Sequence, residues 1–251
     1  MYNKNLISCI VPTYNRPKFL ERSLAHLFNQ TIQNYEVIVI DDCSESTNAQ
    51  LNELICDSYT SCGMSIRYIK LSENSGTVSI PRLIGLSFAE GATLAHIDDD
   101  CFCMSDKLEL LYNALWGESG AFALAYGNRK ESIYKDGLYT EYRRISFKNS
   151  PIENNVGMDN GQFLYKANIY QDIDIPIAIN ACDWELYKRI WNSGKKFIYI
   201  DEYVCDYTWH NNNISKIPKE KRVNPIERLV KFKKCFNKCE FSEKLFNQEG
   251  V

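Results

Sequence analysis

Three adjacent aspartates, Asp98, Asp99 and Asp100, come directly after the apolar segment TLAHI. Neighbouring carboxylates that are withdrawn from water repel one another, so ionising all three is costly unless another group compensates them. Mg²⁺ or Mn²⁺ would compensate them, because these ions prefer carboxylate and phosphate oxygens as ligands. The triplet therefore predicts a divalent cation together with a bound phosphate ester. The triplet alone leaves a second interpretation open, in which the aspartates only solvate a strand end and cap the next helix.

Two more apolar segments end in groups that could join this site. The segment ISCIV leads into Pro12, Thr13 and Tyr14, and the segment YEVIVI leads into Asp41 and Asp42. In an open parallel sheet, ligands bind beyond the carboxyl ends of the strands, near the point where the strand order reverses. We therefore expect five carboxylates and an aromatic ring to converge on one edge of a sheet.

The elements that must position these residues follow from the alternation of short apolar runs with helix-period segments, the pattern of βαβ units. We expect strands at residues 7–11, 35–40, 66–71, 93–97, 121–127 and 196–200. We expect helices from residue 17 and over residues 47–58, 79–90, 106–115 and 183–192. The sequence thus predicts an α/β fold with a mainly parallel central sheet.

Two parts of the chain depart from this alternation. Residues 128–160 are polar and tyrosine-rich, and residues 208–215 have the composition of a polar loop. Between residues 216 and 239, nine Lys or Arg residues occur with only two Glu, and a helix over residues 226–239 would separate an apolar arc from a basic one. Such a helix could lie on an anionic membrane surface, or pack on the domain with its basic face in solvent.

Composition limits the classes of function. The chain has 251 residues, 45% of them hydrophobic, which is enough for a large core, and its net charge of −3 argues against a general nucleic-acid binder. No apolar run has the length of a membrane span and no signal peptide is recognisable, so we expect a cytoplasmic protein, with a location at the inner face of the membrane if the basic helix binds lipid. In a reducing compartment the ten cysteines stay thiols, and without a CxxC pair their spacing does not indicate a zinc site.

Four ordered segments resemble the family 2 glycosyltransferases of GT-A fold. They are SCIVPTYNRPKFLERSLAHLFNQT, YEVIVIDDCSES, NSGTVSIPRLIGLSFAEGATLAHIDDDC and DWELYKRI, and the likeness covers residues 6 to 215. The resemblance implies a nucleotide-binding α/β/α sandwich with a mainly parallel sheet. It implies a catalytic domain over residues 1–215, with a nucleotide-binding half at 1–127 and an acceptor-binding half at 128–215, followed by a basic helical tail at 216–251.

The resemblance also implies the nucleotide-binding residues. Tyr14 would pack against the nucleobase, with Pro12 and Thr13 lining that edge. Asp42 would accept a hydrogen bond from a base N–H, a contact that suits uracil. Arg82 would face the nucleotide or its phosphates, although the family more often has Ala-Arg-Asn where this chain has Pro-Arg-Leu.

The segment IDDDC matches the family's DXD segment, which implies a Mn²⁺ or Mg²⁺ site. Asp100 would be the metal ligand, and Asp98 or Asp99 would contact the ribose. His210 resembles a histidine after the last strand that can contact the metal or the diphosphate. A loop histidine with a structural hydrogen bond is the alternative, since histidine serves either purpose.

The general base of the family lies near the start of a helix, at the position of Asp183. Cys182 stands where the family has Glu, and the alternative is an ordinary aspartate favoured by the helix dipole. Asp159 and Gln162 lie where the family builds its acceptor side, but that segment could equally be a packing strand.

Together these features predict a metal-dependent inverting glycosyltransferase. Its donor would be a nucleotide-sugar, most simply a UDP-sugar, and its acceptor the hydroxyl of a saccharide or a lipid-linked saccharide in surface polysaccharide assembly, such as capsule or lipopolysaccharide. The alternatives are a sugar-nucleotide pyrophosphorylase, whose Gly-rich phosphate loop is missing after the first strand, and a non-catalytic nucleotide-sugar-binding protein.

Overall fold

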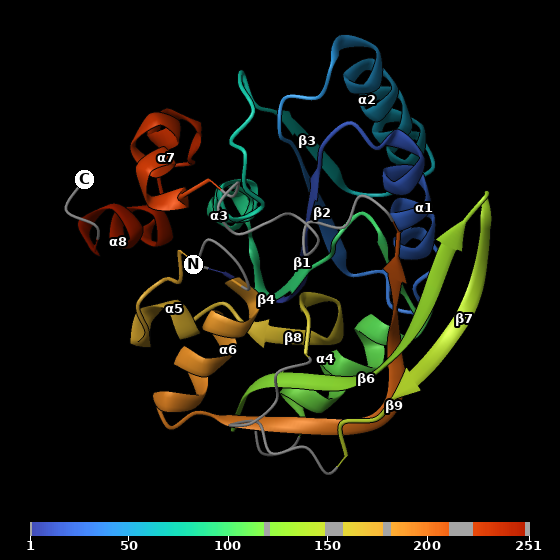
Figure 1. Ribbon diagram of the computed structural model, residues 1–251. Helices are drawn as coiled ribbons and strands as arrows, with labels where there is room; N and C mark the ends of the chain where they lie inside the picture. Colours follow the sequence, from blue (N-terminus) through green and yellow to red (C-terminus); the bar gives the residue numbers. More distant parts are fainter. Residues whose placement is uncertain (1, 118–120, 149–157, 178–181, 211–222, 249–251) are drawn as a thin grey trace.

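A nine-stranded sheet forms the centre of the computed structural model, which describes residues 2–117, 121–148, 158–177, 182–210 and 223–248 (Figure 1). The strands are β1 (Asn3–Thr13), β2 (Tyr35–Asp41), β3 (Ile66–Lys70), β4 (Gly91–His96), β5 (Cys101–Cys103), β6 (Phe122–Lys135), β7 (Leu138–Ile145), β8 (Phe163–Lys166) and β9 (Lys196–Trp209). Their order is β3-β2-β1-β4-β8-β6-β9-β5, with β7 paired to β6. All pairs among β1 to β4 are parallel, as is β6 with β9, whereas β8 joins the two halves through antiparallel pairs.

Helices cover both faces of the sheet, which confirms the α/β architecture. The helices are α1 (Pro17–Phe28), α2 (Ser46–Ser61), α3 (Ser79–Phe88), α4 (Lys107–Trp116), α5 (Ile169–Asp172), α6 (Cys182–Asn192), α7 (Pro225–Phe232) and α8 (Glu240–Gln248), with short 3-10 turns η2 (Asn160–Gln162) and η5 (Lys233–Cys235). Buried side chains of α1, α2 and α4 share one core cluster, and those of α3, α6, α7 and α8 share the other. In Figure 1, α1 and α2 accordingly lie on the opposite side of β1 and β2 from α3, α7 and α8.

The apolar runs of the first strands are continuous because both of their faces are buried. Ile7, Cys9 and Val11 belong to the core under α1, while Ile10 between them belongs to the core under α3. Successive side chains of a strand point to opposite faces, so a strand between two helical layers needs apolar residues at nearly every position. The sequence pattern therefore identified these strands correctly.

The strand order reverses between β1 and β4. From β1 the chain first builds β2 and β3 on one side, then crosses through α3 to place β4 on the other side of β1. The register pairs Ile10 of β1 with His96 of β4 and Thr13 of β1 with Asp41 of β2. The residues that follow these three strands therefore meet at one point, as expected from the sequence.

The region expected to be irregular contains a long hairpin. Strand β6 continues to Lys135 and pairs with β7, joined by Asp136 and Gly137, whose φ angles are +52° and +81°. An Asp-Gly pair with two positive φ angles is the favoured two-residue hairpin turn, a signal that we did not use. Strand β9 likewise reaches Trp209, so the polar loop begins two residues later than expected.

The C-terminal segment is not the single helix expected over residues 226–239. Helix α7 ends at Phe232, η5 follows, and α8 begins at Glu240. The segment between the two helices is held against α3, because the backbone N–H of Asn237 donates to the Ser87 hydroxyl at 3.0 Å. Within the described residues, none of the helices combines the length and hydrophobicity needed to cross a bilayer, and the nine described cysteines are free thiols.

Candidate active site

Two backbone distortions mark the carboxyl edge of the sheet. Asn15 after β1 and Cys43 after β2 have φ angles of +54° and +64°, the left-handed region that costs a non-glycine residue free energy. Contacts hold Asn15 in place, since its N–H donates to the Ser44 hydroxyl and its side-chain oxygen accepts from the Glu45 N–H, both at 2.8 Å. Tight turns therefore fix the directions in which the neighbouring side chains leave the two strands.

Asp99, the middle acid of the triplet, is fully buried. Its Oδ2 accepts from the Thr13 hydroxyl at 2.8 Å, and its Oδ1 lies 2.7 Å from Nη2 of Arg16. Burial raises the pKa of Asp99, although the charge of Arg16 opposes the change. Both of its oxygens therefore contact the protein, and its side chain is closed to a ligand.

Asp100 lies at the same edge but keeps 16% of its side chain exposed. Its Oδ2 accepts from Nη1 of Arg16 and from Nε2 of His210, each at 2.9 Å. Burial alone would raise the pKa of Asp100, but the hydrogen bond from His210 and the charge of Arg16 outweigh it and lower the pKa. The ionised Asp100 carboxylate is the kind of oxygen ligand that Mg²⁺ or Mn²⁺ prefers. His210 could join it as a ligand only after Nε2 gives up the proton that it donates to Asp100 here.

Asp98 pairs with a different arginine. Its Oδ1 forms an ion pair with Nη2 of Arg82, which projects from α3, and the Asp98 side chain is 30% exposed. With its amide oxygen toward the guanidinium, Asn160 of η2 accepts from Nη1 and Nη2 of Arg82 at 2.8 and 3.0 Å. Arg82 of α3 is thus held by Asp98, after the end of β4, and by Asn160 of the 3-10 turn η2.

Asp42 faces the segment between β3 and α3. Its carboxylate accepts from the N–H and the hydroxyl of Ser75 at 2.8 and 2.9 Å, and from the Asn74 amide at 3.0 Å. Burial raises the pKa of Asp42 to about 7, against the effect of the hydrogen bonds from Ser75. Asp42 therefore titrates close to neutral pH.

The remaining predicted nucleotide-binding residues differ in exposure. Tyr14 leaves 43% of its surface exposed, so its ring is accessible to a planar base. Pro12 and Thr13 are buried, and the Thr13 hydroxyl is engaged with Asp99. Of these three residues, Tyr14 is thus the one that is accessible to a ligand.

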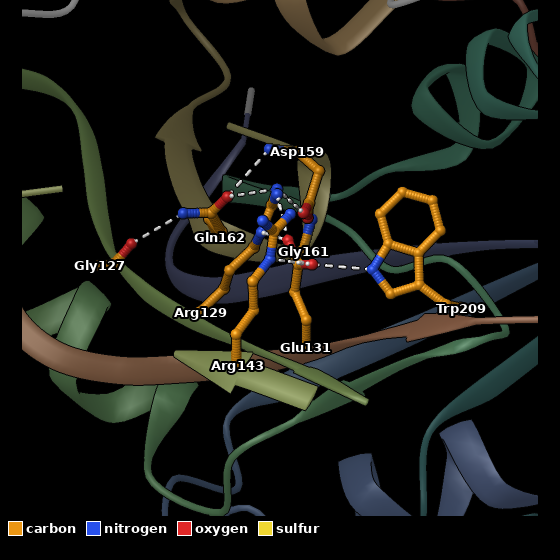
Figure 2. Close-up of polar contacts among 8 residues, drawn as sticks. All are labelled: Gly127, Arg129, Glu131, Arg143, Asp159, Gly161, Gln162 and Trp209. Carbon is orange, nitrogen blue, oxygen red and sulfur yellow. Dashed lines mark hydrogen bonds and ion pairs between the residues drawn. The ribbon is translucent and has the colours of Figure 1, made fainter. Parts of the chain in front are cut away.

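Asp159 and Gln162 join a polar network around Arg129 (Figure 2). Arg129 lies 2.8 Å from Asp159 and 2.6 Å from Glu131, and the fully buried Glu131 also accepts from the Trp209 indole at 2.8 Å. Gln162 is fully buried; its amide donates to the Gly127 carbonyl and its oxygen accepts from the Asp159 N–H. Gln162 therefore organises the fold here, and the network fixes the strand that delivers His210.

The side chain of Asp183 lies outside the described part of the chain. Its helix, α6, is nevertheless positioned by Leu186 one turn later, which lines the same small cavity as Arg82 and Asn160. The start of α6 therefore belongs to the side of the molecule on which Arg82 and Asp98 meet.

Comparison with known proteins assigns the family. A profile described as Glycosyl transferase family 2 matches residues 8–191, which is most of the chain and includes Pro12, Asp42, the acid triplet and Asp183. The chain belongs to glycosyl transferase family 2. One curated relative is the glycosyltransferase GlyG of Streptococcus pneumoniae serotype 4, which is 33% identical over 84% of the chain and 73% of GlyG. Another is the poly(ribitol-phosphate) β-N-acetylglucosaminyltransferase TarP of Staphylococcus aureus, which is 34% identical over 43% of the chain.

A solved structure supports the fold. The crystal structure of S. aureus TarS 1-349 in complex with UDP-GlcNAc matches with a TM-score of 0.67 and 20% identity, covering 91% of this family 2 chain and 65% of TarS 1-349. The likeness confirms the expected GT-A type of α/β fold. Two of the first curated relatives that the chain matches are much longer proteins. The chain covers 33% of the length of one of them and 32% of the length of TarP.

Three partners in this site were not anticipated. Arg16, Asn160 and Ser75 all contact predicted site residues. Arg16 directly follows Asn15 and lies three residues beyond the end of β1 at Thr13, so its place just after the first strand was a usable signal. Asn160 and Ser75 come from distant segments, and no spacing in the sequence connects them to Arg82 or Asp42.

Proposed function

We propose that this family 2 member is a metal-dependent inverting glycosyltransferase that moves a sugar from a UDP-sugar to an acceptor hydroxyl in surface polysaccharide assembly. The observation that carries the proposal is the meeting of Tyr14, Asp42, Asp98 and Asp100 at the point where the strand order reverses. These groups provide an accessible ring, a base acceptor, a hydroxyl acceptor and a cation ligand on one edge.

Accessibility decides the roles of Tyr14 and Asp98, whereas Asp42 is 6% exposed and its contact with the base rests on the family resemblance. Tyr14 packs on the base and Asp42 accepts from the uracil N–H. Asp98, which is partly exposed, accepts from a ribose hydroxyl, and this role is denied to Asp99 because Asp99 is fully buried and engaged. Arg82 adds positive charge for the diphosphate.

Asp100 and His210 would hold Mn²⁺ or Mg²⁺, which would offset the negative charge that develops on the leaving diphosphate. The acceptor hydroxyl is a weak nucleophile near pH 7, so Asp183 takes its proton as general base while the bond to the sugar forms. Attack comes from the face opposite to the departing UDP, and a single displacement inverts the anomeric centre.

The donor and acceptor classes have separate support. UDP is favoured by Asp42 as an acceptor for the uracil N–H and by the UDP-GlcNAc named for the TarS crystal structure. A saccharide of the cell surface, free or lipid-linked, is favoured by the polymer named for TarP.

We also propose that α7 brings the enzyme to the inner face of the membrane. Ile226 and Val230 are 45% and 55% exposed on this helix, while Leu229 is buried, and the exposed Lys234 follows in η5. Exposed apolar groups beside cations suit an anionic lipid surface. Co-sedimentation with anionic vesicles should fall as salt rises, and no binding at low salt would exclude this role.

The enzymatic proposal is tested by two substitutions with one control. Asp100→Asn should weaken Mn²⁺-dependent UDP binding in calorimetry by about tenfold or more, because it removes the charged cation ligand. Asp183→Asn should leave UDP binding unchanged while slowing sugar transfer, followed as UDP release from UDP-GlcNAc, by about 10² to 10⁴-fold.

Asp106→Asn is the matched control, since Asp106 is exposed at the start of α4 and should change neither quantity. If the sugar-transfer activity of Asp183→Asn stays within a few-fold of that of the parent, Asp183 is not the general base. A parent that binds UDP with Mn²⁺ but turns over no UDP-sugar would support a non-catalytic binding protein instead.

A further inference from the structure

The guanidinium of Arg16 lies between the two acids that end the triplet. Nη2 is 2.7 Å from Asp99 Oδ1, and Nη1 is 2.9 Å from Asp100 Oδ2. Only 22% of the Arg16 side chain is exposed, so water screens these ion pairs weakly. A side-chain cation therefore neutralises the carboxylate that we assign to the divalent ion.

The two ion pairs of Arg16 are not equivalent. Asp99 is fully buried and its second oxygen accepts from Thr13, so this contact is an anchor inside the protein. Asp100 is partly exposed, and the oxygen that accepts from Arg16 also accepts from His210. A cation arriving from solvent meets Asp100 before Asp99, and it competes there with the contacts from Arg16 and His210, of which the Arg16 guanidinium is permanently charged.

The backbone holds Arg16 in this position. Arg16 is the N-cap residue of α1 and follows Asn15, whose left-handed conformation is fixed by Ser44 and Glu45 of the segment after β2. The ring of Phe19, one turn into α1, contacts His210 with 5.0 Å between centroids and lies 5.9 Å from the Arg16 guanidinium carbon. Arg16 is thus directed at the acids by the same turn that shapes the edge of the sheet.

We propose that Arg16 is the internal counter-ion of the acid cluster. A divalent cation must displace its Nη1 from Asp100, and the guanidinium, still anchored on Asp99, then pairs with the anionic diphosphate of the donor. The proposal rests on the proposed function, because the diphosphate belongs to the UDP-sugar assigned above. Removing Arg16 should consequently have opposite effects on the two ligands: the bare cation loses a competitor, while the diphosphate loses a partner.

The test is calorimetry of the full chain with Mn²⁺ alone and with UDP alone. Arg16→Gln should bind Mn²⁺ about tenfold more tightly than the parent, because one unit of competing charge is removed beside Asp100. The same variant should bind UDP without metal about fivefold more weakly, because a charge-assisted contact is lost. Arg67→Gln is the control, because Arg67 lies on the exposed strand β3 and pairs with Glu90. This substitution removes the same charge and should shift neither affinity.

Arg16→Lys protects the test against misfolding of Arg16→Gln. A lysine keeps the charge but cannot bridge two carboxylates, so its Mn²⁺ affinity should lie between those of the parent and Arg16→Gln. If the parent binds Mn²⁺ and UDP but both variants bind Mn²⁺ equally or more weakly, the role of Arg16 is overturned while the proposed function stands. A parent that binds neither ligand would overturn the proposed function and this inference with it.

Discussion

At the scale of single residues, three identical side chains in a row occupy three different environments. Asp98 pairs with Arg82 and is 30% exposed, Asp99 is fully buried, and Asp100 is 16% exposed beside His210. The backbone turns at Asp99 and Asp100, where the Cys101 N–H donates to the Asp98 carbonyl at 3.1 Å, so the three side chains leave in different directions and meet different partners. The triplet therefore separates into one buried structural anchor, Asp99, and two accessible acids, to which we assign a ribose contact and a cation ligand only as proposals.

Asp42 should make UDP binding depend on pH. Its pKa in the free protein is about 7, so only a minor fraction is ionised at pH 6 and most is ionised at pH 8. If the ionised form accepts the uracil N–H, UDP affinity should rise about tenfold between these pH values. Calorimetry of UDP binding across this range, at constant ionic strength, measures the effect.

Asp42→Asn is the control for this prediction, because the phosphates of UDP titrate identically with parent and variant. The variant should lose the extra pH dependence and bind UDP more weakly at pH 8. Equal slopes for parent and variant would show that Asp42 does not contact the base in its ionised form.

Asp42 should also make the free energy of unfolding depend on pH, but this free energy should fall as pH rises, whereas UDP affinity should rise. The folded-state pKa of Asp42 is raised from its ordinary 3.8 to about 7, so between these values the unfolded chain releases the proton first. The contribution of Asp42 to stability is therefore lost as pH rises from about 4 to 7, and urea unfolding of Asp42→Asn should lack this decline.

At the scale of elements, the close approach of α3 to the sheet positions the arginine of the site. Gly85 lies one turn after Arg82, and a Cβ built there would lie 2.5 Å from Ile10 Cγ2 and 3.4 Å from Ile40 Cγ1. Both isoleucines are fully buried, so neither can yield freely. The absence of a side chain at residue 85 thus sets the distance at which α3 delivers Arg82 to Asp98.

Gly85→Ala should consequently affect both folding and binding. Overpacking against Ile10 is expected to cost about 1–3 kcal/mol in the free energy of unfolding measured in urea. UDP affinity should fall several-fold as well, because Arg82 moves with the helix. Gly117→Ala serves as the control, since its Cβ would meet only backbone carbonyl oxygens at the end of α4, those of Asn113 at 3.1 Å and Ala114 at 3.7 Å. An equal loss in both variants would refute the special role of Gly85.

At the scale of the whole molecule, the C-terminal helices complete the core beneath α3. Leu229 and Phe232 of α7 and Phe241 and Leu245 of α8 are buried in the same cluster as Ile80 of α3. Lys231 of α7 also forms an ion pair with Glu73, in the segment before α3. The basic helix thus packs on the domain, while its outer side remains available for the proposed contact with lipid.

Leu229 and Val230 are adjacent in α7, but Leu229 is buried in the core and Val230 is exposed. Leu229→Ala should lower the free energy of unfolding by about 2–5 kcal/mol, because a fully buried side chain is lost. Val230→Ala should change it by less than about 0.5 kcal/mol, since Val230 is 55% exposed. Chemical denaturation of both variants measures the contrast, and similar values for the two would contradict the packing of α7 on α3.

The sequence by itself determined the α/β fold and the edge of the sheet at which the candidate site lies. Continuous apolar runs alternating with helix-period segments leave few arrangements other than a sheet covered on both faces, and the residues after ISCIV, YEVIVI and TLAHI must then meet. Only the tertiary structure decided the partners of those residues. Arg16 and His210 reach Asp100 across 84 and 110 residues of chain, and Asn237, between α7 and α8, donates to Ser87 of α3. Local patterns do not encode such contacts between distant segments.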